Sequence, residues 1–202
     1  VHTLPFVTNQ FAYSKVPSDP VTDFAPVSLL SSVASVLVSH PALPVNSMKD
    51  LVALARAKPG AITYGTAGAG SNPHIAGELL NILAKIEMVH VPYKGGGPAL
   101  TDLLAGQMQL MFATMPAAMP HVKAGKLRAV AVTTAQRSLT LTALPTVAEA
   151  GIRGYEASTW YGLLAPAATP PAVVQRLHQE TVRALAAAEL RERLGAQGFE
   201  SV

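Results

Sequence analysis

The chain has 202 residues, of which 50% are hydrophobic, 13% are charged and 5% are aromatic. This composition excludes a disordered chain, and the lack of cysteine excludes a disulfide framework and a cysteine-based zinc site. No apolar run reaches the roughly 18 residues that a membrane-spanning helix needs. The formal charge of +3 comes without a run of Lys or Arg, so no nucleic acid partner is expected.

The positive charge is concentrated in the middle of the chain. Residues 49–169 contain ten basic and six acidic residues, whereas the flanking segments are close to neutral. A diffuse positive charge suits a small anionic ligand, although a small net charge also simply favours solubility. The sequence leaves both interpretations open.

The chain begins with alternating strand and helix patterns. Residues 13–26 contain three prolines and predict an extended loop. A capping box from Ser47 to Asp50 opens the first predicted helix, which Pro59 and Gly60 end. Short apolar or Val-rich segments predict the first strands, at residues 27–30, 35–39 and 61–65.

A glycine-rich loop follows the strand at 61–65 and leads into the second predicted helix. The loop reads GTAGAGSN at 65–72, with Asn72 as the helix N-cap and Pro73 in the first turn. The apolar stripe that helical spacing predicts to be buried consists of Ile75, Leu79, Ile82 and Leu83.

The same strand–loop–helix unit repeats at 88–106. Residues 88–92 predict a strand, YKGGG (93–97) a loop, and the following helix runs from Pro98 to Gly106. The elements after it are a strand at 109–114, a helical stretch at 115–124, a strand at 127–133, a capping box with a short helix at 146–149, a strand at 157–165, a helix capped by Thr169, and a helix at 189–197 ending at Gly198. The apolar face of the Thr169-capped helix is predicted at Val173, Val174, Leu177, Val182 and Leu185.

Strands that alternate with helices through short loops predict an α/β fold with largely parallel sheets. Such sheets bind ligands at the carboxyl ends of their strands, where the loops meet helix N-termini. Both glycine-rich loops lie at such ends.

Neither loop matches a known nucleotide-binding fingerprint. The first reads G-x-x-G-x-G, which is neither the dinucleotide motif nor a P-loop, and in the second Lys94 precedes the glycines. Glycine still allows backbone N–H groups to approach a ligand, and a helix N-terminus favours an anion. A carboxylate could be held in this way without a titrating catalyst, although such loops can also be glycine-rich only in order to turn tightly.

Patterns for catalysis are mostly absent. There is no G-x-S-x-G motif and no cysteine nucleophile, and the six histidines lack metal-ligand spacing. His74 could donate to an anion or could serve as a capping or packing residue. Lys94 could bind a carboxylate or lie solvated in its loop. Trp160 and Tyr161 could form the wall of a pocket, but filling the core is the favoured interpretation.

Several segments together resemble one known family. The chain is similar to the substrate-binding proteins of tripartite tricarboxylate transporters, the Bug-type family, over essentially its whole length. The segments that carry the resemblance are DPVTDFAPV (19–27), YGTAGAGSNPHIAGEL (64–79), MVHVPYKGGGPALTDLLAGQMQLMF (88–112), HVKAGKLRAVAVTT (121–134), LPTVAEAG (144–151) and YEASTWYGLLAPAATPPAVVQRL (155–177).

The resemblance implies a bacterial periplasmic binding protein of the Venus-flytrap kind, type II-like, with two α/β lobes. Residues 34–160 would form the second lobe, and 1–33 with 161–202 would form a partial, discontinuous first lobe. Such proteins close a cleft between their lobes over a small carboxylate: a dicarboxylate, a tricarboxylate, an acidic amino acid or an aromatic acid. They present it to the permease subunits of a membrane transporter. They are not enzymes, carry no cofactor or metal, and are expected to be monomers.

The resemblance also implies which residues contact the ligand. Around the first loop these are Thr66, Ala67, Gly68, Ser71 and His74. From the second loop and the following strand they are Tyr93, Lys94, Gly95 and Thr114. Thr159 and Trp160 would lie at the crossover near the cleft.

Two departures from the family pattern stand out. The Pro-Pro-Gly-Gly loop that supplies part of the first-lobe site is not matched, and no signal peptide is present, so we expect one in the precursor. Ala113 and Thr114 replace the polar pair that often follows the Met-Phe of the strand at 109–114.

Two other functions remain as alternatives. An α/β enzyme could use the loops to hold a phosphate or acyl group, with His74 or Lys94 active. An effector-binding domain of a transcription regulator shares the two-lobed architecture, but it should come with a helix-turn-helix segment that the sequence does not show.

Overall fold

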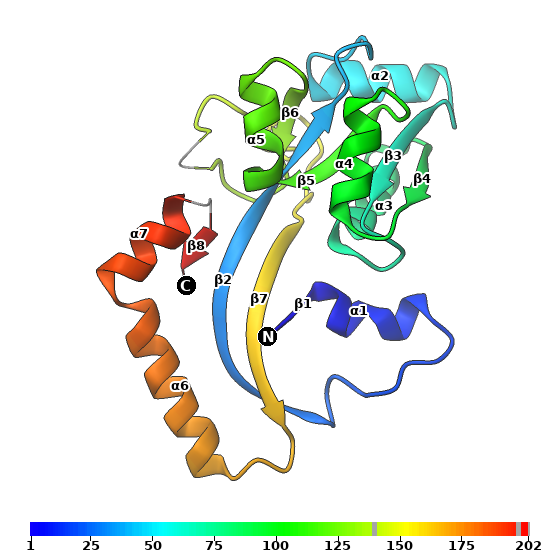
Figure 1. The fold of residues 1–202 in the computed structure, drawn as a ribbon. Coiled ribbons are helices and arrows are strands. Elements are labelled where there is room, and N and C mark those ends of the chain that lie inside the picture. Colours follow the sequence, from blue (N-terminus) through cyan, green and yellow to red (C-terminus); the bar gives the residue numbers. More distant parts are fainter. Residues whose placement is uncertain (139–140, 197–198, 202) are drawn as a thin grey trace. The chain divides into compact units, whose positions relative to one another are not determined.

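The computed structural model describes residues 1–138, 141–196 and 199–201. The chain forms two compact units, residues 1–33 with 159–202, and residues 34–158 (Figure 1). Strand β2 (Phe24–Ser39) belongs to both, because it runs from the first unit into the second. The α/β fold expected from the sequence is confirmed, while the predicted lobe boundaries stay a prediction.

The second unit is built on a sheet in which parallel and antiparallel pairs are mixed. Its strands, besides the end of β2, are β3 (Ile62–Thr66), β4 (Met88–Pro92), β5 (Leu110–Thr114) and β6 (Arg128–Val132). Strand β3 lies between β4 and β5 and is parallel to both, as predicted. Strand β2, in contrast, pairs antiparallel with β5 and β6, so the sheet is less uniformly parallel than expected.

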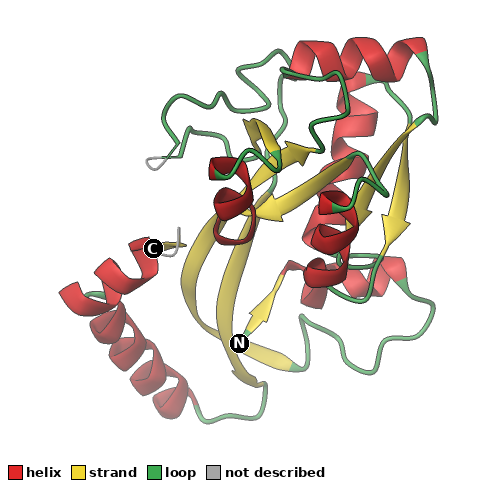
Figure 2. Ribbon diagram, turned by 45° about the horizontal axis from the view of Figure 1, so that its top comes forward, coloured by secondary structure: helices red, strands yellow, loops and turns green. Residues whose placement is uncertain are grey.

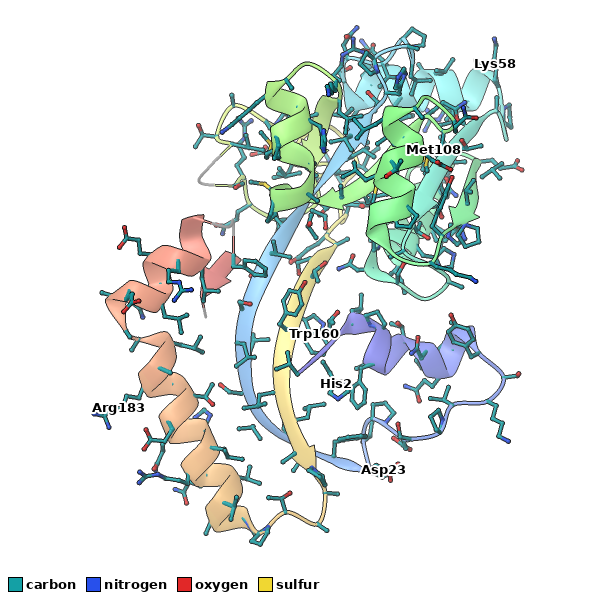
Figure 3. All side chains as sticks on the ribbon, viewed as in Figure 1. His2, Asp23, Lys58, Met108, Trp160 and Arg183 are labelled. Atoms are coloured by element: carbon teal, nitrogen blue, oxygen red, sulfur yellow. The ribbon has the colours of Figure 1, made fainter. Side chains whose placement is uncertain are left out.

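Helices cover both faces of this sheet (Figure 2). The helices are α2 (Met48–Ala57), α3 (Asn72–Ala84), α4 (Gly96–Leu104) and α5 (Met115–Lys123). One buried cluster joins α2 and α3 to the face that carries Tyr64 and Phe112. The other joins α4 and α5 to the opposite face, where Met108, labelled in Figure 3, occupies the space beside Gly65.

The two predicted capping boxes form, with differences of detail. Ser47 caps α2 by accepting a hydrogen bond from the Asp50 N–H at 3.2 Å. The Asp50 carboxylate accepts from the N–H of Asn46, one residue before the cap, at 3.0 Å, and this bond lowers the pKa of Asp50. Thr146 and Glu149 exchange both bonds of the box at 3.0 Å, yet the segment after them is a turn and not the predicted helix.

The predicted buried stripe of α3 is wrong at Ile82 and Leu83, whereas Leu79 is half-buried and packs against the core. Ile82 is 70% exposed and Leu83 is 38% exposed, whereas Ala76, Leu80 and Ala84 are buried. Small residues face the sheet because the helix lies close to it. The residues that face inward also include Gly77, whose position leaves no room for a side chain: a Cβ there would come within 2.2 Å of the Tyr64 ring.

Replacing Gly77 tests this close approach. We expect Gly77→Ala to lower the free energy of unfolding by about 1–3 kcal/mol, because the new methyl group overpacks against the Tyr64 ring. Urea unfolding followed by circular dichroism measures the change. Gly97→Ala in α4 is the matched control, since a Cβ at Gly97 meets no atom within 4 Å. An equal loss in both variants would contradict the packing argument.

The first unit contains the rest of the described elements. These are β1 (His2–Thr3), α1 (Leu4–Ala12), the start of β2, β7 (Ser158–Pro166), α6 (Pro171–Leu185), α7 (Ala188–Ala196) and β8 (Phe199–Ser201). Strand β7 pairs antiparallel with β1 and also neighbours β2, which pairs antiparallel with β8. The rings of His2, Phe6 and Phe24 pack together, with centroids 4.2–5.9 Å apart.

Three sequence predictions fail in this region or at its border. The two strands expected at 27–30 and 35–39 form one 16-residue strand, β2. Helix α6 is capped by Pro170 and not by Thr169. Its predicted apolar face is largely open, with Val173, Leu177 and Val182 exposed by 47%, 42% and 47%. The predicted helix end at Gly198 lies outside the described residues.

None of the helices in the described part of the chain combines the length and the hydropathy required to cross a membrane.

Candidate functional site

The two glycine-rich loops of the second unit lie against each other. They follow β3 and β4, which are parallel neighbours, so both loops leave the same edge of the sheet. The Tyr93 N–H donates to the Thr66 carbonyl at 3.1 Å, and the Gly95 N–H donates to the Ala67 carbonyl at 3.3 Å. The structure therefore brings together the first-loop and second-loop residues that the resemblance implied.

Three helices begin at this edge. Helices α3, α4 and α5 follow β3, β4 and β5, and their N-caps are Ser71, Gly95 and Thr114. None of these three caps makes a side-chain hydrogen bond to its helix. The first N–H groups of a helix have no partner inside it, and the helix dipole adds about 0.3–1 kcal/mol of favourable interaction with an anion. The edge thus favours negative charge.

Asn72 was expected to cap α3 but is its first residue. Ser71 takes the cap position, in extended conformation. The Asn72 side chain is buried and donates its amide to the Ser158 carbonyl at 2.7 Å. Asn72 therefore fastens the start of the helix to the end of the second unit.

The first loop turns on two glycines in the left-handed region. Gly68 has φ +126° and Gly70 has φ +74°. The Gly68 carbonyl accepts from both the Ser71 hydroxyl, at 2.6 Å, and the Ser71 N–H, at 3.2 Å. Since the Ser71 hydroxyl already donates its proton here, Ser71 offers a ligand an oxygen acceptor before it offers a donor.

His74 contacts the first glycine-rich loop through its imidazole ring. Its Nδ1 accepts a hydrogen bond from the Gly70 N–H at 3.1 Å, so the neutral ring carries its proton on Nε2. Its ring also stacks on His90 with centroids 4.0 Å apart. Of the two interpretations that the sequence left open, the contacts favour the capping and packing residue.

His90 is the residue that sequence reasoning missed. Its Nε2 lies 2.6 Å from the Thr66 hydroxyl oxygen, and its ring stacks on Tyr64. Burial lowers the pKa of His90; the nearby His74 lowers it further, and Glu78 opposes them. The available signal was the strand register, since parallel pairing sets Tyr64 beside His90.

The side chains of the second loop are less available to a ligand than the sequence suggested. The Tyr93 hydroxyl donates to the Asp102 carboxylate at 2.7 Å, which raises the pKa of Tyr93 and turns the phenol toward α4. Lys94 is exposed. Thr114 is half-buried at the start of α5 and pairs with Ser35 across the sheet. The backbone N–H groups of this loop are therefore better placed than its side chains to contact a ligand.

Thr159 and Trp160 belong to the first unit. Thr159 is buried, and the Trp160 indole packs over Gly162, where a Cβ would lie 3.1 Å from the ring (Figure 3). Trp160 and Tyr161 are both half-buried, so neither fills the core completely, and Tyr161 packs against Phe199 at 5.7 Å between ring centroids. A ligand contact from Thr159 or Trp160 stays a prediction.

The first unit also has an open cavity of about 600 Å³ between the start of β2 and α6. His178 closes one side, with its Nδ1 2.8 Å from the Val27 carbonyl. The other lining residues are neutral: Ala25, Pro26, Ala167, Thr169, Pro171, Val174 and Gln175. Apart from His178, the residues that line this cavity have no ionisable side chain.

Comparison with known proteins identifies the family. Residues 1–202 match the family described as the tripartite tricarboxylate transporter family receptor, TctC. The chain belongs to this family, so the resemblance seen in the sequence is confirmed. It is 35% identical to Protein BugT of Bordetella pertussis, over 93% of this chain and 57% of BugT.

Solved structures agree with this assignment. Rpa4515 of R. palustris, determined with adipate, is 37% identical, with a TM-score of 0.91 over 99% of this chain and 67% of that one. MatC of Rhodopseudomonas palustris, determined with bound malate, is 30% identical, with a TM-score of 0.86 over 98% of this chain and 68% of that one. The chain spans 60% and 57% of the length of two curated relatives that it matches.

The lowered pKa of His90 predicts that stability depends on pH. Between the folded pKa and the ordinary value of 6.5, the unfolded chain binds more protons at this residue than the native state does. The contribution of neutral His90 to the free energy of unfolding is therefore complete above about pH 6.5, and it is lost as the pH falls through the lowered pKa of the folded state. Urea unfolding between pH 5 and pH 8 measures the effect.

His90→Gln should flatten this pH dependence, because glutamine does not titrate. The prediction is wrong if His90→Gln keeps the wild-type slope.

Proposed function

We propose that this chain is part of a periplasmic solute receptor that binds a small carboxylate and delivers it to the permease of a tripartite tricarboxylate transporter. One observation carries the proposal: two tied glycine-rich loops and three helix N-termini gather at one edge of the sheet in the second unit. That arrangement presents backbone N–H groups and positive partial charge to an anion.

The ligand class follows from charge and from the relatives. Residues 49–169 hold the excess of basic residues, and two related structures contain adipate and malate. Charge-assisted hydrogen bonds from backbone N–H groups contribute about 1.5–3 kcal/mol each. A few of them reach the roughly 8 kcal/mol of micromolar binding without any catalytic group.

We propose binding without turnover. An enzyme that held a phosphate or acyl group would need His74 or Lys94 as an active group. The Nδ1 of His74 is engaged with Gly70, and Lys94 is exposed in its loop. Family membership favours the receptor, and with it a periplasmic location and a monomer that meets its permease through protein contacts.

A ligand panel tests the proposal. The full chain, refolded to remove any bound solute, is screened by thermal shift against adipate, malate, citrate, glutamate and benzoate. At least one carboxylate should stabilise it, by about 2.7 kcal/mol at a concentration one hundred times its Kd. Mass spectrometry should recover that ligand unchanged. Stabilisation by none of them would refute carboxylate binding, and a chemically altered ligand would favour the enzyme.

Substitution of Gly68 tests whether the first loop holds the ligand. An alanine there is strained at φ +126° and crowds the Tyr93 carbonyl at 3.3 Å. We expect Gly68→Ala to weaken carboxylate binding about tenfold or more, through at least one lost hydrogen bond. Isothermal titration calorimetry measures the affinity.

Gly151→Ala is the matched control for Gly68→Ala. Gly151 also lies in the left-handed region, at φ +111°, but a Cβ there meets no atom within 4 Å. It should therefore lower stability through backbone strain and leave the affinity unchanged. Equal affinity losses in both variants would show that general strain, and not the loop, controls binding.

A further inference from the structure

A cluster of five polar side chains lies beneath the first glycine-rich loop. Three elements contribute: β3 with Tyr64 and Thr66, α3 with His74 and Glu78, and β4 with His90. Parallel register sets Tyr64 beside His90, and Thr66 follows two residues later on the same face. The four neighbouring contacts are Tyr64–Glu78, Tyr64–His90, Thr66–His90 and His74–His90.

The Thr66 hydroxyl links His90 to the first glycine-rich loop. Its oxygen accepts from the Gly68 N–H at 3.1 Å and lies 2.6 Å from Nε2 of His90. A hydroxyl oxygen can accept two hydrogen bonds and donate one, so the bond to His90 forms whichever ring nitrogen carries the proton. In both tautomers this bond holds the hydroxyl in the position where it accepts from the Gly68 N–H.

The two histidines act on different points of the loop. His90 holds the Thr66 hydroxyl, which in turn accepts from the Gly68 N–H, and His74 accepts from the Gly70 N–H directly. Gly68 and Gly70 are the two loop residues with positive φ. His90 and His74 thus each support one of the two glycine positions at which the loop turns.

We propose that His90 is a positioning residue for the ligand loop, acting through the Thr66 hydroxyl to hold Gly68 in its binding conformation. This inference rests on the proposed function and deepens it, since it assigns a role to a residue two positions before the end of β4. A loop that is ordered before the ligand arrives loses less conformational freedom on binding. His90 then contributes to affinity without contacting the ligand.

A double-mutant cycle in the full chain tests the proposal, with adipate as the probe, or malate if adipate does not bind. His90→Leu and Thr66→Val should each weaken binding about three- to tenfold, the value of one neutral hydrogen bond. The double variant should lose no more than the worse single variant, because both remove the same link. Additive losses would overturn the proposal.

Two further variants separate positioning from stability. His90→Gln keeps a hydrogen-bonding atom near the Nε2 position and should bind within about twofold of the wild type. Tyr64→Phe removes the hydroxyl that donates to Glu78 at 2.6 Å, so it should lower the Tm and leave affinity unchanged. Weak binding by both His90→Gln and Tyr64→Phe would show that the cluster acts only through stability.

An NMR measurement makes the test independent of any ligand. The nitrogen-15 shift of His90 Nε2 at pH 7.5 should differ between the wild type and Thr66→Val, because the variant removes the hydrogen-bonding partner of this atom. An unchanged shift in Thr66→Val would overturn the inference even if carboxylates bind. The expected shift change, together with a panel in which no carboxylate binds, would refute the proposed function alone.

Discussion

Helix α3 can lie directly on strand β3 only because Gly77 has no side chain. The Tyr64 ring occupies the space that a Cβ at Gly77 would need, 2.2 Å away. This contact sets the height of α3 above the sheet, and with it the place of every group that the helix carries. Ala76, Leu80 and Ala84 are buried in this interface, while Glu78 accepts from the Tyr64 hydroxyl and His74 stacks on His90.

The position of α3 also determines the geometry of the loops. The helix begins directly after the turn at Gly68 and Gly70, and the Gly70 N–H donates to His74 in the first turn of the helix. The second loop is then aligned through the backbone, by the bonds from Tyr93 to Thr66 and from Gly95 to Ala67. A single apolar contact and a few backbone bonds therefore order two segments that are about 25 residues apart in the chain.

The sequence was sufficient for features that depend on local chemistry. The strands that precede the two glycine loops, the capping boxes and the positions of both loops follow from residues close in the chain, and they were predicted. The inward face of α3 was not predicted. Hydrophobic spacing selects large apolar residues such as Ile82, whereas the close approach at Gly77 places Ala76, Leu80 and Ala84 against the sheet. His90 was missed for a related reason: its partners come from β3 and α3, and only strand register reveals them. Likewise, Ser31 and Ser35 interrupt the apolar pattern of the sequence but are buried in β2, where they pair with β8 and β5.

The hydrogen bonds of the loops also indicate what kind of ligand these loops can recognise. The Ser71 hydroxyl donates to the Gly68 carbonyl and the Tyr93 hydroxyl donates to Asp102, whereas Nδ1 of His74 accepts from the Gly70 N–H. These polar atoms are therefore engaged within the second unit. The backbone N–H groups and the dipoles of three helices attract a carboxylate whatever the length of the molecule behind it. Two related proteins bind adipate and malate, which differ in length but share carboxylate ends. On the proposed function, these loops would hold the common carboxylate, and discrimination between solutes would have to come from residues elsewhere in the receptor.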